Sequence, residues 1–442
     1  MTTDVNTLRA NWNYPTAVRF GVGRIKELPD ACKELGIKRP LLITDPVVAK
    51  LPMTKEVVQI CDQAGLVTSV FYDIKPNPVG KNVDDGVRAF RLGNNDGVIA
   101  FGGGSALDAA KAVALMVGQT RPLWDFEDVG DNWSRVDLSG MRPCVAVPTT
   151  SGTGSEVGRV SVIIDERAHQ KKLIFHPRLQ PAKVICDPTL TVGMPPKLTG
   201  ETGLDALSHN LEAYCSPFFH PQAAGIALEG MRLVHTSLLA AQREPTNLLA
   251  RAEMLAASLM GAAAFQRGLG AMHSVAHACG GLLDTPHGRT IAVMMPYVLV
   301  LNRPAIDQRL ARLAAYLGLP RPSFEAVLEW VLQLRQQLGI PHTLAELGAR
   351  REHVAQLTEL AVADPSGGTN PVALNKDNLR QLIEHALVGK LPAVVAAKPA
   401  PKVAAKARPK AQAKTAAKPK AKPANKRPAA KPKRKAAPRR RK

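Results

Sequence analysis

The stretch Gly97-Val-Ile-Ala-Phe-Gly-Gly-Gly-Ser-Ala-Leu-Asp-Ala-Ala-Lys111 decides the fold class of this 442-residue chain. It begins with a short, fully apolar run that predicts a buried parallel strand, and an Ala-rich helical run follows the three glycines. Such a turn is an anion site, because N–H groups at the helix N-terminus are free and glycine lets a phosphate approach closely. The spacing matches neither GxGxxG nor a Walker motif. Three consecutive glycines exceed what a tight turn needs, so the pattern favours the pyrophosphate of a dinucleotide.

The sequence on both sides of this unit continues the alternation of strands and helices. Strands are predicted at residues 40–45, 67–72, 143–148 and 182–187, with a hairpin-like pair at 160–165 and 172–175. From about residue 197 the apolar residues recur at i, i+3, i+4, which predicts helices, among them 225–241, 248–261, 305–317 and 324–338. We therefore expect an α/β, Rossmann-like dinucleotide-binding domain at residues 1–190 and an all-α domain at residues 191–390.

A loop rich in hydroxyls and glycine, Thr149-Thr-Ser-Gly-Thr-Gly-Ser-Glu156, follows the strand at 143–148. Such a loop suits sugar hydroxyls and phosphates, and it equally suits an ordinary polar connection.

Five polar side chains in the helical part have the spacing of a metal site. Asp205 and His209 are four residues apart in one predicted helix, and His273 and His277 are four apart in another, so each pair shares a helix face. His287 follows Pro286 and would have to return from a loop or a new helix start. The alternative is a solvated helix face, but these side chains lie among apolar residues, where a buried charge needs a partner. One carboxylate and two or three imidazoles predict a divalent-metal site in the all-α domain. The remaining histidines have no clustered partners and are predicted to be structural or at the surface: His169, His176, His220, His235, His342, His353 and His385.

The formal charge of +21 is a property of the C-terminal tail. Residues 398–442 contain 19 Lys or Arg and no Asp or Glu, whereas the rest of the chain has 39 basic residues against 37 acidic ones. Residues 391–442 consist mostly of Ala, Lys, Pro and Arg, which predicts a disordered tail. Counterion release favours contact with DNA, RNA or another polyanion, without sequence specificity; a solubilising tail is the alternative.

The cysteine pattern and the apolar runs bear on location. Six scattered cysteines without a CxxC pair fit reduced thiols better than a disulfide framework. The chain has no apolar run near twenty residues, and its first residues lack the basic and apolar regions of a signal peptide. The sequence therefore predicts a cytoplasmic protein that does not cross a membrane.

The motifs, taken together and in order, resemble those of the iron-containing, or group III, alcohol dehydrogenase family over residues 14–387. They are Pro76-Asn-Pro78, Gly102-Gly-Gly-Ser-Ala-Leu-Asp-Ala-Ala-Lys111, Pro148-Thr-Thr-Ser-Gly-Thr-Gly-Ser-Glu156, Thr202-Gly-Leu-Asp-Ala-Leu-Ser-His209, and Gly268-Leu-Gly-Ala-Met-His-Ser-Val-Ala-His277 with His287-Gly288. Two positions depart from the usual pattern: Glu201, where many members have Ala, and Arg267, where similar sequences often have Lys. Both are predicted to be near the cleft and to affect substrate preference.

The resemblance implies a role for each site residue. It makes Asp205, His209, His273 and His287 the metal ligands and places His277, as a catalytic residue, beside the substrate and the nicotinamide. The residues that it places on the cofactor are Asp45, Asn77, Gly103, Gly104, Ser105, Asp108, Thr149, Thr150, Thr153 and Lys171, with the adjacent Lys172 as the alternative to the last. Asp45 would accept hydrogen bonds from the adenosine ribose and repel a 2′-phosphate, so NAD is favoured over NADP.

The activity that the resemblance implies is reversible oxidation of a primary or secondary alcohol, diol or hydroxy acid to its aldehyde or ketone. Fe²⁺, or Zn²⁺ in its place, would act as a Lewis acid on the substrate oxygen, and hydride would pass to nicotinamide C4. The proton would leave through water, a ribose hydroxyl or His277. The alternatives are a zinc glycerol-type dehydrogenase, a metal-free maleylacetate-type reductase, which the complete ligand set disfavours, and a nucleic-acid-associated protein with a vestigial enzyme body. The resemblance also suggests a homo-oligomer, a dimer or larger.

Overall fold

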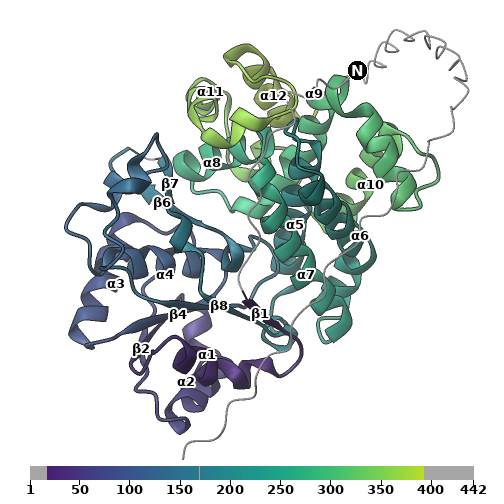
Figure 1. Cartoon of the computed structure of the whole chain (residues 1–442). Helices are drawn as coiled ribbons and strands as arrows, with labels where there is room; N and C mark the ends of the chain where they lie inside the picture. Colours follow the sequence, from purple (N-terminus) through teal and green to yellow (C-terminus); the bar gives the residue numbers. More distant parts are fainter. Residues whose placement is uncertain (1–16, 169, 393–442) are drawn as a thin grey trace, which may run out of the picture. The chain divides into compact units, whose positions relative to one another are not determined.

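Six parallel strands form the central sheet of the first half of the chain in the computed structural model, which describes residues 17–168 and 170–392 (Figure 1). Their order is β1–β8–β5–β4–β2–β3, and β4 pairs with β5 through Ile99 and Val145. The strands are β1 (Ala17–Phe20), β2 (Pro40–Ile43), β3 (Ser69–Phe71), β4 (Gly97–Gly102), β5 (Cys144–Pro148) and β8 (Lys183–Cys186). The sequence analysis placed all of these strands except β1, so the prediction of a Rossmann-like α/β domain is confirmed.

Helices cover both faces of this sheet, which explains why its strands are continuous apolar runs. Leu42, Ile99 and Val145 belong to the core on one face, with residues of α1 (Leu28–Glu34) and α2 (Pro52–Gln63). The alternate strand residues belong to the core on the other face, with α3 (Gly80–Leu92) and α4 (Gly104–Met116) (Figure 1). The carboxyl ends of β2, β4 and β5 therefore meet at one edge, where ligands bind in open α/β sheets.

The predicted hairpin is a separate antiparallel pair, β6 (Val160–Asp165) and β7 (Gln170–Phe175). It lies beside a helix of the second half of the chain, α8 (Figure 1). A Cβ added at Gly280 of that helix would be 2.9 Å from Cε of Lys171, so the glycine permits close packing of the hairpin.

The second half of the chain is all helical, as predicted, and its helices share one apolar core. They are α5 (Pro196–Cys215), α6 (Pro221–Arg243), α7 (Leu248–Ala264), α8 (Ala271–Leu283), α9 (His287–Tyr316), α10 (Phe324–Gln337), α11 (Val354–Ala363) and α12 (Lys376–Val388). Among the described residues one helical segment, Leu248–Arg267, is long and apolar enough to cross a membrane. Half of its most apolar stretch is buried in the molecule, and a buried core helix passes the same test.

Helix α9 differs from the prediction, which began a helix only at residue 305. It runs from His287 through Pro296 and Pro304 without a break. An internal proline costs a helix about 3 kcal/mol, which is why the pattern suggested a later start. The stretch around Pro296 is buried in the helical core, and that packing compensates for the lost hydrogen bonds. His287 is consequently the first residue of a new helix.

The domain limits at residues 190 and 390 remain predictions. The last strand of the sheet ends at Cys186 and α5 begins at Pro196, on either side of the first limit. The predicted disordered tail, residues 391–442, lies outside the described residues apart from Leu391 and Pro392.

Candidate metal and dinucleotide site

The glycine turn lies between the end of β4 and the start of α4. Gly102 has a φ of 144°, and Gly103 is the N-cap of α4 without a side-chain hydrogen bond, so the first amides of the helix are open to a ligand. A Cβ at Gly104 would come within 2.4 Å of Thr153 Cγ2, and one at Gly103 within 3.3 Å of Thr150. The threonine loop after β5 therefore closes over this turn, and only glycine leaves room for the pair. The cradle fits a pyrophosphate.

Asp45 follows the neighbouring strand β2 and faces the same turn. Its Oδ1 accepts hydrogen bonds from the amides of Val47 and Val48 at 2.9 and 3.0 Å. Its Oδ2 would be 3.7 Å from a Cβ on Gly102. One carboxylate oxygen thus orients the side chain, and the other faces the glycine turn.

Like Asp45, three further predicted cofactor residues have side-chain partners within the chain. Asn77 Nδ2 donates to Asp284 Oδ1 at 2.6 Å, and the Ser105 hydroxyl donates to the carbonyl of Pro76. Asp108 accepts from Ser155 Oγ at 2.5 Å and from the amide of Val162 at 3.1 Å, and its Oδ1 is 3.1 Å from Lys111 Nζ. Asp108 therefore fastens α4 to the threonine loop and the hairpin.

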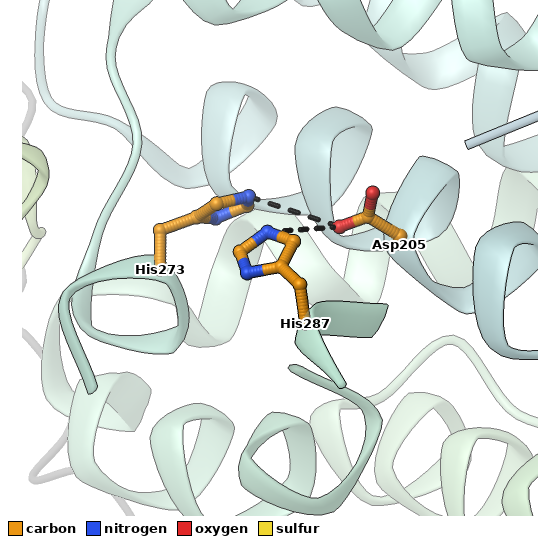
Figure 2. Close-up of side chains that lie close together, drawn as sticks. All are labelled: Asp205, His273 and His287. Carbon is orange, nitrogen blue, oxygen red and sulfur yellow. Dashed lines mark ion pairs between the residues drawn. The ribbon is translucent and has the colours of Figure 1, made fainter. Parts of the chain in front are cut away.

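Three of the predicted metal ligands, His209, His273 and His287, surround one oxygen of the fourth, Asp205 Oδ1. Figure 2 shows this arrangement for His273 and His287. The Nε2 atoms of His287, His209 and His273 are 3.6, 3.9 and 4.0 Å from this oxygen. Asp205, His273 and His287 form the tightest group, with donor atoms within 4.8 Å of one another, and His209 stacks on His273 with ring centroids 4.6 Å apart. We call these four residues the Asp–His cluster.

Three atoms of this cluster lack hydrogen-bond partners: His287 Nδ1 and two that face each other, Asp205 Oδ1 and His273 Nε2. Asp205 Oδ1 and His273 Nε2 are buried without a hydrogen bond, although burying an unpaired polar atom costs free energy. A divalent cation among the four side chains would satisfy both. The carboxylate and imidazole donors suit Fe²⁺ or Zn²⁺.

His277 lies next to the Asp–His cluster, where its ring stacks on that of His287 at 5.3 Å between centroids. Its Nδ1 is 2.9 Å from Asp364 Oδ2. The Asp364 carboxylate therefore selects the tautomer with a proton on Nδ1, which leaves Nε2 as the proton acceptor.

Sequence reasoning missed the residues that orient these imidazoles. Glu212 Oε2 is 2.5 Å from His273 Nδ1, and the carbonyl of Gly152 is 3.3 Å from His209 Nδ1. Such partners fix which nitrogen faces a metal ion. Glu212 could have been found, because it lies two helical turns after Asp205 on the same face. Asp364 could not, because it is 87 residues from His277.

The titration behaviour of the cluster also favours metal binding. Burial lowers the pKa of His209 to about 4 and that of His287 well below its usual range. Burial likewise lowers the pKa of His273, but the carboxylates of Glu212, Asp205 and Asp364 together outweigh it, and the net direction is upward. His209 and His287 are therefore neutral near pH 7, the form that coordinates a metal ion.

Of the two candidate lysines, only Lys171 lines the chamber beside the cluster. Burial lowers its pKa to about 8. Lys172 instead forms ion pairs with Glu127 at 3.1 Å and Asp165 at 3.2 Å.

Two chambers with a common wall lie on this side of the molecule, and the first is lined by residues of the cluster. The first, of about 200 Å³, is lined by the glycine turn, by one face of the hairpin and by three residues of the cluster, His209, His273 and His287. The second, of about 290 Å³, shares Val160, Leu173, Phe265 and Leu269 with the first and continues away from the cluster.

The two positions that depart from the family pattern line neither chamber. Glu201 Oε1 accepts from Arg289 Nε at 2.7 Å and so joins α5 to the start of α9, near His287. Arg267 donates to the carbonyls of Phe218 and Tyr214 near the end of α5. Both have structural contacts that account for them. The described isolated histidines likewise lie outside both chambers.

Comparison with known proteins covers most of the described part of the chain. Residues 15–188 match the family described as "Iron-containing alcohol dehydrogenase", and residues 199–387 match "Fe-containing alcohol dehydrogenase family, C-terminal". The chain is 34% identical over 384 residues to a 4-hydroxybutyrate dehydrogenase of Cupriavidus necator, covering 85% of this chain and 99% of that protein. It is 32% identical over 384 residues to an NAD-dependent methanol dehydrogenase of Bacillus methanolicus, covering 85% and 100%. A crystal structure of a 1,3-propanediol oxidoreductase superposes with a TM-score of 0.81 at 31% identity, covering 86% and 100%.

Proposed function

The chain belongs to the iron-containing alcohol dehydrogenase family, and from this premise we propose that the Asp–His cluster holds its divalent metal ion. Membership makes it a metal-dependent oxidoreductase that transfers a hydride between NAD(H) and an alcohol or diol. The observation that carries the proposal is the arrangement of three imidazoles around Asp205 Oδ1, an oxygen that is buried, like His273 Nε2, without a hydrogen-bond partner.

The cofactors and the side chains have different roles in the reaction. When bound, the metal ion supplies a Lewis acid for the alcohol oxygen, and the nicotinamide accepts the hydride. The amides at Gly104 and Ser105 hold the pyrophosphate, and Thr149, Thr150 and Asn77 lie along the nucleotide. His277 Nε2 accepts the alcohol proton, directly or through a ribose hydroxyl, because Asp364 keeps the other nitrogen protonated.

NAD is the dinucleotide that Asp45 favours. A carboxylate at this position accepts hydrogen bonds from the 2′- and 3′-hydroxyls of the adenosine ribose and repels a 2′-phosphate. Lys171, which faces the same chamber as the cluster, contacts the nicotinamide end of the cofactor.

The substrates are small primary or secondary alcohols, diols and hydroxy acids. Iron is the metal of the family. Zn²⁺ binds nitrogen and oxygen donors more tightly than Fe²⁺, so a zinc-loaded, glycerol-type dehydrogenase is the second candidate. A homo-oligomer, a cytoplasmic location and polyanion binding by the tail remain predictions from the sequence.

Metal analysis combined with NAD-linked turnover tests the proposal. We expect Asp205→Ala and His273→Ala to lose bound metal and activity over a panel of alcohols, diols and hydroxy acids. The control variant His385→Ala removes a histidine of α12 that lies outside both chambers. It is expected to retain bound metal and activity. Retention of metal and turnover by the two cluster variants would sink the proposal.

A further inference from the structure

The β6–β7 hairpin turns one face toward the two chambers, and the polarity of this face changes along its length. Alternate side chains of paired strands lie on the same side, so residues 160, 162 and 164 of β6 share a face with 171, 173 and 175 of β7. All six line a chamber. The middle of this face is apolar, with Val162 opposite Leu173, and Lys171 is at the end near the cofactor.

A second cation, Arg159, lies at the other end of the hairpin. It immediately precedes β6 and lines the second chamber. Its guanidinium carbon is 5.8 Å from the centroid of the Phe175 ring, which lines the same chamber. In the part of the chain that the structure describes, no carboxylate forms an ion pair with Arg159. A cation stacked on an aromatic ring without an acidic partner is suited to an anionic ligand.

The path from the cluster to Arg159 suits an aliphatic chain. The wall common to both chambers consists mostly of Val160, Leu173, Phe265 and Leu269. Four residue steps separate Lys171 from Phe175, which at the rise of a β-strand is about 14 Å.

The other charge in the second chamber does not oppose an anion strongly. Asp128 lines this chamber; the residue is exposed to solvent, which screens its charge, although partial burial raises the pKa of its carboxyl. Gln180 is a further polar side chain in the lining.

We propose that Arg159 binds the distal carboxylate of an ω-hydroxy acid whose hydroxyl-bearing carbon lies at the Asp–His cluster. This inference rests on the proposed function and narrows its substrate class. An aliphatic chain fills the apolar wall between the two ends, and the guanidinium pairs with the carboxylate through two parallel hydrogen bonds. A diol of the same length gains no comparable interaction at this end.

Steady-state kinetics with matched substrates tests the assignment. A series of ω-hydroxy acids is compared with diols of equal length, in the full chain and in the variants Arg159→Gln, Arg159→Lys and Asp128→Asn. We expect Arg159→Gln to lower kcat/KM for the acids about tenfold to hundredfold, mainly through KM, because a charged hydrogen bond is lost. For the diols, kcat/KM in Arg159→Gln should change less than about twofold. For the acids, Arg159→Lys should have a kcat/KM between those of the wild-type chain and Arg159→Gln, because lysine keeps the charge without the planar fork. Asp128→Asn should leave kcat/KM for the acids unchanged or raise it.

A binding measurement separates this inference from the proposed function. The probe is the monocarboxylic acid of the same chain length, which cannot react. Its binding to each protein is measured by calorimetry. The probe should bind the wild-type chain and Asp205→Ala, which lacks turnover, but not Arg159→Gln. Two results for Arg159→Gln would overturn the role of Arg159: an equal loss of kcat/KM for acids and diols, or probe binding as strong as in the wild-type chain. Either result would leave the dehydrogenase proposal intact. Active Asp205→Ala would overturn the metal proposal instead.

Discussion

The carboxylate of Glu212 lies behind the Asp–His cluster and holds one of its imidazoles. One oxygen is 2.5 Å from His273 Nδ1, and the other accepts the amide of Met272 at 2.8 Å. Because Nδ1 is engaged in this way, Nε2 points at Asp205. The same arrangement recurs at His277 with Asp364. The tautomer of each imidazole is therefore set by a residue that lines neither chamber.

Glu212→Gln is expected to weaken metal binding by about 10- to 100-fold, the usual effect of losing an outer partner of a metal-binding histidine. The measurement is a competition titration with a chelator, followed by metal content. Glu384→Gln, an exposed acid on α12, is the matched control and should bind as the wild-type chain does. Unchanged affinity in Glu212→Gln would show that the packing of α8 alone orients His273.

The buried carboxyl group of Glu156 is expected to make the stability of the fold depend on pH. Burial raises the pKa of its carboxyl to about 7, although Lys111 lowers it, and Oε1 has no hydrogen-bond partner. The folded chain thus keeps a proton that the unfolded chain releases near pH 4.5, so stability falls as pH rises from about 4.5 to 7. The ionised carboxylate costs on the order of 3 kcal/mol above that window.

Glu156→Gln removes this cost without changing shape. Urea unfolding at pH 5 should give similar midpoints for both chains, whereas at pH 8 the variant should be the more stable one. A variant that is less stable at pH 8 would mean that the carboxylate is a net stabilising partner of Lys111.

At the scale of elements, the glycine turn depends on two loops that must approach each other. Gly104 begins α4, and Thr153 belongs to the loop after β5; these positions meet because β4 and β5 are neighbours in the sheet. A methyl group at Gly104 would have to displace Thr153 Cγ2 from 2.4 Å.

Gly104→Ala is therefore expected to raise KM for NAD at least about tenfold, since one lost charged hydrogen bond to the phosphate is already worth this much. Gly225→Ala is the matched control: this glycine is also helical, in α6, and a Cβ there meets nothing within 4 Å. The control should keep the KM of the wild-type chain and gain slightly in stability. If both variants bind NAD normally, the turn is only a tight connection.

Helix α5 shows how an element is fixed by its neighbours. It carries Asp205 and His209, and its last carbonyls, those of Tyr214 and Cys215, accept hydrogen bonds from Arg309 Nη1 at 3.0 and 2.8 Å. Cations at a helix C-terminus are favourable because they compensate the free carbonyls and the helix dipole. The ligands of the cluster are thus carried by a helix that is anchored at its far end.

At the scale of the molecule, the site lies where the sheet edge, the hairpin and the helical half meet. The first chamber is lined by residues of all three. The sequence adds a basic tail to this body, and its 19 Lys or Arg residues have no acidic neighbours between 398 and 442.

Deletion of the residues after Lys390 is expected to abolish salt-dependent retention on DNA and to leave the kinetics for alcohols unchanged. The reason is that neutralising phosphates releases counterions, and nearly all the excess positive charge is in the tail. The measurement is retention on DNA over a salt gradient, with two unrelated DNA sequences as a check that binding is non-specific. Equal retention of the shortened chain would end this prediction.

Local sequence patterns were sufficient for much of the fold and for the ligand candidates. The strand, glycine turn and helix at 97–111 are set by short-range preferences, and the i, i+4 spacing of Asp205 with His209 follows from helix geometry alone. The excess charge of the tail is likewise a matter of composition. The start of α9 was not predictable from local preference, because burial in the helical core overrides the cost of Pro296.

The tertiary structure decided which of these groups act together, since their partners are distant in sequence and meet only when the helices and the sheet pack. Packing brings Asp364 to His277 and leaves Lys171, not Lys172, in the chamber. It also leaves Asp205 Oδ1 and His273 Nε2 buried without partners. The sequence by itself determined most of the elements and their reactive side chains. The burial of these side chains at their meeting point, together with the partners that set each tautomer and charge, was decided by the three-dimensional packing alone.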